Sequence, residues 1–238
     1  MPHDPATDTT PYRMIYNALN SSSNIRLSIV AKLRTGLMPL VLLYLLVCIP
    51  LGLTVYTPYA YQWYCPINPR CELISASFAQ QSMQQLTDFL QHQTARLFPP
   101  WSHKEHLHML EVRGMYDKAA GLFGLLLLWI SYDVWQPNAR IRYQRHLRHS
   151  SYMILGLVLA CLLIMPFFQY FWLHIFHPLL FNNQLWRIDQ SDVSWYLMPR
   201  QFFMWVIGFI VAASLLLHVL LWWSLRLTCS TEQPVTDR

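Results

Sequence analysis

Four long apolar stretches alternate with polar segments along this 238-residue chain. A helix needs about 20 mostly apolar residues to cross the hydrocarbon core of a membrane, and each stretch is long enough. The pattern therefore predicts an all-α integral membrane protein built as a four-helix bundle. The predicted spans run from Leu37 to Tyr56, from Met115 to Trp135, from Tyr152 to Phe176 and from Phe202 to Leu225.

The composition agrees with this class of protein. Hydrophobic residues make up 54% of the chain and charged residues only 12%, and the mean hydropathy is +0.25. These values exclude an ordinary soluble domain, in which about a quarter of the residues are charged. The chain also contains neither a glycine-rich phosphate-binding loop nor a G-x-S-x-G motif. The sequence therefore predicts no bound cofactor and no serine-hydrolase site.

Lysines and arginines are concentrated beside two of the polar segments, which fixes the expected orientation. Because basic residues near span ends mark the cytoplasmic side, both chain ends should be cytoplasmic, with flexible tails at 1–35 and 227–238. Residues 57–114 and 177–201 then form two outer loops. The net charge of +5 reflects this topology and attraction to anionic lipids, so no nucleic-acid partner is expected. The basic residues are Arg26, Lys32 and Arg34 before the first span and Arg140, Arg142, Arg145 and Arg148 before the third.

The first outer loop has a helical pattern of its own. Phe78, Met83, Leu86 and Phe89 recur at helical spacing among polar residues, which predicts an amphipathic helix from Ile74 to Leu97. This helix would lie flat on the outer leaflet or pack over the bundle.

Cys65 and Cys71 stand six positions apart in the same loop. A disulfide is plausible on the outer side of a membrane. A zinc pair is disfavoured, because paired zinc ligands usually stand two to four residues apart.

Titratable residues crowd the start of the second predicted span. Ser102 and Glu105 form an S-x-x-E capping box, which predicts the start of a helix that continues into the span. His108 and Glu111 then share one face of that helix. A carboxylate three residues from a histidine can orient the imidazole ring and raise its basicity.

Three interpretations of these histidines compete. The first makes His103 and His106 interfacial polar residues, and the second makes His103, His106 and His108 metal ligands. One straight helix would not bring all three imidazoles to a single ion. The third makes His108 a general base with a partner on the same face of the membrane, for which His177 at the outer end of the third span is the candidate.

Two segments of the chain resemble the bacterial lipoprotein intramolecular transacylase (Lit) family. The resemblance covers roughly Leu37 to Leu225, and the order and spacing of the motifs carry it. Glu111 and Arg113 stand where the family motif commonly has Asp and Lys, which conserves both charges. The first motif comprises Ser102, Glu105, His108, Met109, Glu111, Val112 and Arg113, and the second comprises Phe176, His177, Phe181, Trp186, Asp192, Pro199, Phe202 and Phe203.

The resemblance implies a reaction on the outer face of the bacterial inner membrane. A family member moves the sn-2 acyl chain of a diacylglyceryl lipoprotein to the α-amino group of its N-terminal cysteine, which gives a lyso-form lipoprotein. The partners would be this lipoprotein and membrane lipid, and we expect a monomer. Carried over by position, His108 and His177 would be the catalytic pair. The supporting residues would be Glu105, Glu111, Arg113, Asn182, Trp186 and Asp192.

The chemistry of this reaction requires a base and an oxyanion donor. An α-amino group has a pKa of roughly 8, so near neutral pH much of it is protonated and cannot attack an ester. An imidazole can remove that proton and return it to the departing glycerol oxygen. Arg113, Asn182 and Asn183 are candidate donors to the developing oxyanion.

Two alternatives to the transacylase remain open at this point. A zinc-dependent membrane hydrolase could use His103, His106, His108 or His177 together with Glu111. A non-enzymatic membrane assembly factor could use the first outer loop as a partner-binding surface.

Overall fold

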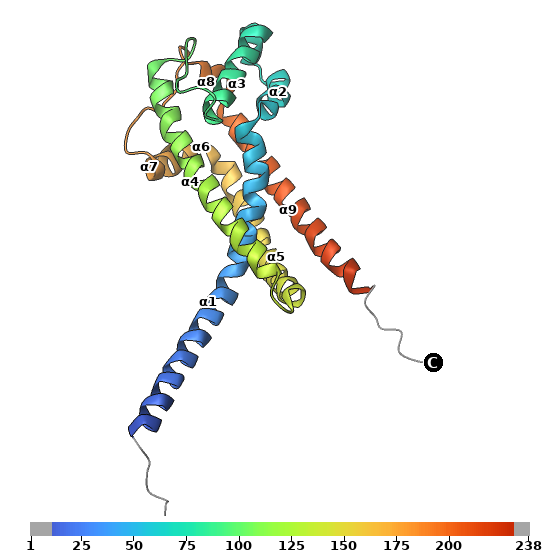
Figure 1. Cartoon of the computed structure of the whole chain (residues 1–238). Coiled ribbons are helices and arrows are strands. Elements are labelled where there is room, and N and C mark those ends of the chain that lie inside the picture. Colours follow the sequence, from blue (N-terminus) through green and yellow to red (C-terminus); the bar gives the residue numbers. More distant parts are fainter. Residues whose placement is uncertain (1–10, 231–238) are drawn as a thin grey trace, which may run out of the picture.

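The computed structural model describes the backbone of residues 11–230 and the side chains of residues 34–226, and all secondary structure within these ranges is helical. Four long helices form a bundle: α1 (Pro11–Tyr56), α4 (His103–Val134), α5 (Ala139–Ile164) and α9 (Arg200–Ser230). Helix α1 packs against α4, α5 and α9, and α5 also packs against α9. The four helices converge along the C-terminal part of α1 (Figure 1).

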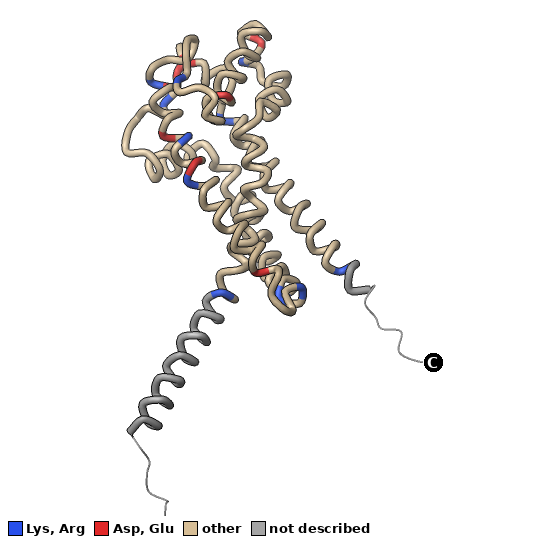
Figure 2. Tube along the Cα trace, viewed as in Figure 1, with Lys and Arg blue, Asp and Glu red and all other residues tan. Residues whose placement is uncertain are grey.

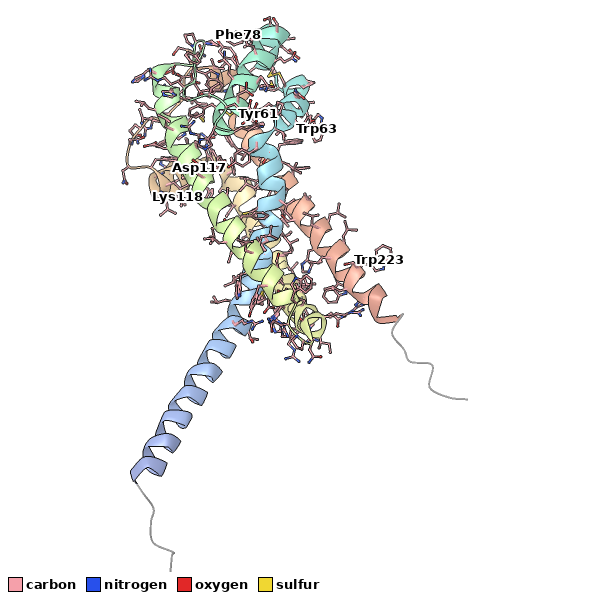
Figure 3. All side chains as sticks on the ribbon, viewed as in Figure 1. Tyr61, Trp63, Phe78, Asp117, Lys118 and Trp223 are labelled. Carbon is pink, nitrogen blue, oxygen red and sulfur yellow. A yellow bond between two sulfur atoms is a disulfide. The ribbon has the colours of Figure 1, made fainter. Side chains whose placement is uncertain are left out.

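Three segments within the described residues are apolar and long enough to cross a membrane. They are Arg34–Tyr56, Ala139–Leu180 and Arg200–Arg226, which contain the first, third and fourth predicted spans. Helix α4 does not reach the same apolar character, because Asp117 and Lys118 interrupt it near its middle (Figure 3). The prediction of an all-helical membrane protein is confirmed, and the second span stays a prediction.

The expected tails fall largely outside the described residues. Residues 1–10 and 231–238 lie wholly outside them. Helix α1 already begins at Pro11, inside the segment 1–35 that we expected to be flexible. No glycine or proline occurs between Pro11 and Gly36, so nothing in that sequence interrupts the helical backbone.

The first outer loop folds into short helices that pack over one end of the bundle. They are α2 (Tyr59–Tyr64), the 3₁₀ turns η1 (Cys65–Ile67) and η2 (Cys71–Leu73), and α3 (Ala76–Leu90), with α8 (Val193–Leu197) beside them (Figure 1). Met83, Leu86 and Phe89 on one face of α3 are buried in a shared apolar core with Tyr61 of α2 and Leu197 of α8. The amphipathic pattern therefore packs over the bundle. Cys65 and Cys71 are joined by a disulfide, with Cα atoms 5.6 Å apart.

Helix α3 ends at Leu90, so the predicted end at Leu97 is wrong. His92 takes a left-handed conformation with φ of 62°, which no continuous α-helix contains. The backbone N–H groups of Gln93 and Thr94 then return to the Asp88 carbonyl. The apolar face ends at Leu90, and the polar residues after it give a helix nothing to bury.

The third apolar segment is not one regular helix. After α5 it passes through a 3₁₀ turn, η3 (Met165–Phe167), a short α6 (Phe168–Tyr170), a π-helical turn, η4 (Phe171–Phe176), and α7 (His177–Leu180). Pro166 lies in the first of these breaks and removes a backbone donor. The segment therefore continues to Leu180 and turns its last residues towards α4 (Figure 1).

The two ends of the bundle differ in charge (Figure 2). At one end, the buried carboxylate of Asp133 pairs with Arg34 and with Arg142, whose nitrogen lies 3.4 Å away. The arginines of the α4–α5 turn and early α5 are at this end. At the other end, acidic and basic residues are interspersed among the outer helices (Figure 2). The expected orientation relative to the membrane rests on this distribution of charge and stays a prediction.

Candidate active site

A cavity of about 490 Å³ lies between α4, the η4–α7 segment and the start of α9. His108 of α4 and His177 of α7 both line it. Its remaining walls combine aromatic, aliphatic and basic side chains. They include Trp172, Trp186, Trp195, Phe203, Arg70, Arg187 and Arg200.

His108 and His177 are brought together although they stand 69 positions apart in the sequence. Both are buried, and the centroids of their rings lie 6.3 Å apart. Phe181 packs against both rings, at 4.8 Å from His108 and 5.8 Å from His177. The capping box at Ser102 and Glu105, which is present as predicted, fixes the start of α4 and so the face on which His108 lies. Trp186 packs on the His177 ring at 4.6 Å.

The π-helical turn determines which nitrogen of His177 is basic. His177 Nδ1 lies 2.7 Å from the carbonyl oxygen of Trp172, five residues earlier. Because a carbonyl only accepts hydrogen bonds, Nδ1 carries the proton and donates it. In the neutral ring, Nε2 is then the unprotonated nitrogen. His177 is therefore held by its own backbone with an available proton acceptor.

His108 lies beside a carboxylate without a good hydrogen bond to it. Its Nδ1 is 3.7 Å from Oε2 of Glu111, and each of these two buried atoms lacks a hydrogen-bond partner. Burial, with a smaller contribution from His177, lowers the pKa of His108 to about 4, and Glu111 opposes that shift. His108 is therefore a neutral imidazole near pH 7. The other Glu111 oxygen accepts a hydrogen bond of 2.7 Å from Asn183 Nδ2.

Glu105 and Asp192 lie in a separate polar network that joins α4 to the second outer loop. Glu105 accepts from the Ser102 N–H at 2.9 Å, from the Ser194 N–H at 2.7 Å and from the Ser194 hydroxyl. Asp192 accepts from the Ser102 hydroxyl at 3.0 Å and pairs with Lys104 at 2.6 Å. Both carboxylates are almost fully buried. They hold the second loop against α4 and so position His177 relative to His108.

Of the predicted supporting residues, Trp186 lines the cavity, whereas Glu105, Glu111, Arg113, Asn182 and Asp192 do not. Arg113 donates to the carbonyls of Phe89 and Thr94, at 3.2 and 3.4 Å, and its guanidinium lies 4.1 Å over the Phe89 ring. It therefore binds the segment that follows α3. Asn182 is exposed, and its neighbour Asn183 makes the contact with Glu111. The Asn183 side-chain oxygen also accepts from the Leu185 N–H at 3.0 Å, and the Asn183 backbone carbonyl accepts from Trp186 Nε1.

The histidines proposed as metal ligands do not converge. His103 is exposed, whereas the His106 ring accepts from the Leu97 N–H at 3.3 Å and packs on Phe89. Across the described part of the chain, no three residues of the types His, Cys, Asp and Glu are grouped to hold a metal ion. The geometry gives no support to a zinc site at His103, His106 and His108.

Two features of the cavity were not predicted from the sequence. The Trp172 carbonyl that orients His177 depends on a π-helical turn, which has no recognisable signal in the sequence. The arginines Arg70, Arg187 and Arg200 come from three segments that only the fold brings to one cavity. Their shared position on the outer loops was the one available signal.

The chain matches a known protein family. A family model described as lipoprotein intramolecular transacylase Lit matches residues 33–203. No curated protein gives a significant match.

Two solved structures share the fold. One is an in meso structure of the membrane integral lipoprotein intramolecular transacylase Lit from Bacillus cereus, with 19% identity and a TM-score of 0.68 over 86% of this chain and 100% of that chain. The other is a variant of the same protein with one histidine replaced by arginine, with 18% identity and a TM-score of 0.65 over 90% and 100% of the two chains. Both likenesses concern the fold.

Proposed function

The chain belongs to the lipoprotein intramolecular transacylase (Lit) family, and from that membership we propose its reaction. The protein transfers the sn-2 acyl chain of a diacylglyceryl lipoprotein to the α-amino group of the N-terminal cysteine. A C–N bond forms, the glycerol ester C–O bond breaks, and one proton passes from the amine to the glycerol oxygen. The product is an N-acylated lyso-form lipoprotein.

The observation that carries this proposal is the pair of buried imidazoles on one cavity, 6.3 Å apart. His177 acts as the general base, because its Nδ1–H is held by the Trp172 carbonyl and Nε2 is left to accept the proton of the amine. The same proton then passes to the glycerol oxygen as the tetrahedral intermediate collapses. Such proton transfers typically contribute about 100- to 10,000-fold in rate.

His108 contributes a hydrogen bond in its neutral form. A neutral imidazole has one N–H, which can donate to the ester oxygen as negative charge develops there. Burial holds the pKa of His108 at about 4, so the ring stays neutral at physiological pH. Glu111 lies beside it, and Asn183 holds the Glu111 carboxylate in place.

The remaining barrier is lowered by proximity. The attacking amine and the ester belong to one lipoprotein molecule, so a cavity that holds both ends close converts the reaction into a unimolecular step. The aromatic walls Trp172, Trp186 and Phe203 give the acyl chains an apolar surface next to the histidines.

The proposed topology has four spans, with α4 as the second. Helix α4 has 32 residues, or about 48 Å at 1.5 Å per residue, which is long enough to cross a bilayer. It runs along α1 to the arginine-rich end of the bundle (Figures 1 and 2), and His108 near its other end lines the cavity. With the arginine-rich end in the cytoplasm, both termini are cytoplasmic and the cavity opens on the outer face of the bacterial inner membrane. The protein acts as a monomer.

Mass spectrometry of a lipoprotein's N-terminal peptide tests the proposal in cells. Cells with this protein should give a peptide that has gained an N-acyl group and lost one glyceryl acyl chain, and cells without it should not. Cells that express the double variant H108Q/H177Q at the same level are the matched control. Unchanged lipoproteins in cells that contain the intact protein would overturn the proposed reaction.

A further inference from the structure

Three arginines line the same cavity as the two histidines. Arg70 comes from the first outer loop, Arg187 from the second, and Arg200 is the first residue of α9. The cavity lining contains no aspartate or glutamate. The basic charges of three separate segments therefore meet at one cavity.

Two of these guanidinium groups rest on tryptophan rings of the cavity wall. The guanidinium carbon of Arg70 lies 4.0 Å from the centroid of Trp195, and one of its nitrogens donates to the Trp195 carbonyl at 3.1 Å. Arg187 lies 5.4 Å from the centroid of Trp186. Stacking on a ring limits the motion of a guanidinium and leaves its N–H groups free at the edge.

None of the three arginines pairs with a carboxylate within residues 34–226. Other basic residues of the protein do: Lys104 pairs with Asp192 at 2.6 Å, and Arg142 with Asp133 at 3.4 Å. Under the proposed orientation the cavity opens on the outer face, where topology does not call for arginines. Neither membrane topology nor ion pairs with carboxylates within the described residues account for the positions of these three arginines. An anionic ligand would account for them.

We propose that Arg70, Arg187 and Arg200 bind the phosphate of a membrane glycerophospholipid, with its acyl chains along the apolar wall of the cavity. The arginine fork matches two oxygens of a phosphate, and three such groups can share one. The apolar wall includes Leu173 and Phe203, which belong to the apolar helices, so the ligand that fits both surfaces is an amphiphile with an anionic head. Diacylglyceryl cysteine contains no phosphate, so the proposed substrate does not account for these arginines, although both ligands would use the same cavity.

Lipid binding to the purified, delipidated full-length protein in a neutral detergent tests this site. Native mass spectrometry would count the bound molecules of dioleoylphosphatidylglycerol and of dioleoylglycerol, which has the same acyl chains without the phosphate. We expect the phosphatidylglycerol to bind about ten-fold more tightly or better, and the double variant R187Q/R200Q to lose that preference. Arg70 stays intact in this variant because its bond to Trp195 also supports the fold.

R96Q is the matched control, because Arg96 is an exposed residue of the first outer loop that does not line the cavity. It should bind the lipid as the unmodified protein does. Any lipid bound at the separate basic pocket of Arg145, Arg148 and Arg226 is common to all variants and cancels in the comparison. Equal unfolding temperatures would show that R187Q/R200Q is folded, and R187K/R200K should recover part of the binding.

Three results would overturn the proposal. The first is equal binding of dioleoylglycerol and phosphatidylglycerol to the unmodified protein. The second is complete competition by millimolar inorganic phosphate, which would identify a free-anion site. The third is an effect of R187Q/R200Q on the binding of an acidic diacylglyceryl lipopeptide but not of phosphatidylglycerol. Each of these concerns binding, so the outcome is independent of whether His108 and His177 catalyse acyl transfer.

Discussion

Two polar groups on the first turns of α4 lie three residues apart and differ in how completely they are satisfied. Glu105 is 2% exposed and receives hydrogen bonds from Ser102 and Ser194 at both of its oxygens. His108 is 8% exposed, and its Nδ1 and the facing Glu111 Oε2 have no hydrogen-bond partner. Burial alone therefore does not separate the two positions.

The difference indicates that Glu105 and His108 have different roles on the same helix. Buried polar groups in folded proteins nearly always find partners, and those that do not often mark sites of binding or catalysis. The Glu105 network is complete and joins α4 to the loop that carries Asp192. The group around His108 and Glu111 is incomplete, which leaves hydrogen-bonding capacity for a substrate.

The largest expected effect is a loss of activity when the histidines of the cavity are replaced. His108→Gln and His177→Gln should each slow lipopeptide conversion by about 100-fold or more, since each removes a proton acceptor or an N–H donor from the cavity. Their unfolding temperatures should stay within a few degrees of the unmodified protein. Conversion rates of purified variants in liposomes, measured beside their thermal unfolding, check both statements. An H177Q protein that kept its activity would show that His177 is not the general base.

In the Glu105 network, where both carboxylate oxygens accept hydrogen bonds, the expected effect of a substitution is on stability. Glu105→Ala leaves the Ser102 and Ser194 N–H groups and a buried hydroxyl without an acceptor, which should cost about 3 kcal/mol. Thermal unfolding in one detergent measures this loss. Glu72→Ala, at an exposed glutamate of the same outer region, is the control and should change little. If the two variants unfolded at the same temperature, the network would not have the structural role assigned here.

The pH dependence of stability sharpens the same comparison. Unfolded His108 binds a proton near pH 6.5, but burial lowers its pKa in the folded protein to about 4. Between these values the unfolded state holds more protons, so stability falls as pH is lowered from about 6.5 to 4, by about 2 to 3 kcal/mol. His108→Gln should remove this contribution and so make the measured slope shallower. Unfolding temperatures of both proteins across that range provide the test, and identical slopes would contradict the low pKa.

The smallest expected effect is on kcat, and it distinguishes two adjacent asparagines. Asn183→Ala should lower kcat by about 3- to 10-fold with little change in KM, because it releases one hydrogen bond that positions Glu111. Asn182→Ala should have no effect, since that side chain is exposed. Steady-state kinetics of the pair decide between them, and a larger loss for Asn182→Ala would reverse the assignment.

The sequence predicted those parts of the protein that depend on local pattern. The start of α4 followed from Ser102 and Glu105, because a capping box satisfies its own backbone groups. The buried face of α3 followed from the spacing of Met83, Leu86 and Phe89. The approach of His108 to His177 was expected from their positions at the same depth of two helices, and the structure places both on one cavity.

Features that depend on tertiary contacts were not predictable. Arg113 follows Glu111 by two residues and was expected in the site, but the Phe89 and Thr94 carbonyls draw it to the other side of the helix. The choice of Asn183 over Asn182 depends on the fold of the second outer loop, in which Asn183 also bonds Leu185 and Trp186. The end of α3 depends on the left-handed backbone at His92, and the orientation of His177 depends on a π-helical turn.

The most direct test follows one acyl chain through the reaction. A synthetic diacylglyceryl lipopeptide with an isotope label only in its sn-2 chain would be incubated in liposomes with the purified protein or with H108Q/H177Q. We expect tandem mass spectrometry to find the label on the cysteine nitrogen with the unmodified protein and on glycerol with the double variant. Label released as free fatty acid, or equal transfer by both proteins, would contradict the proposed reaction.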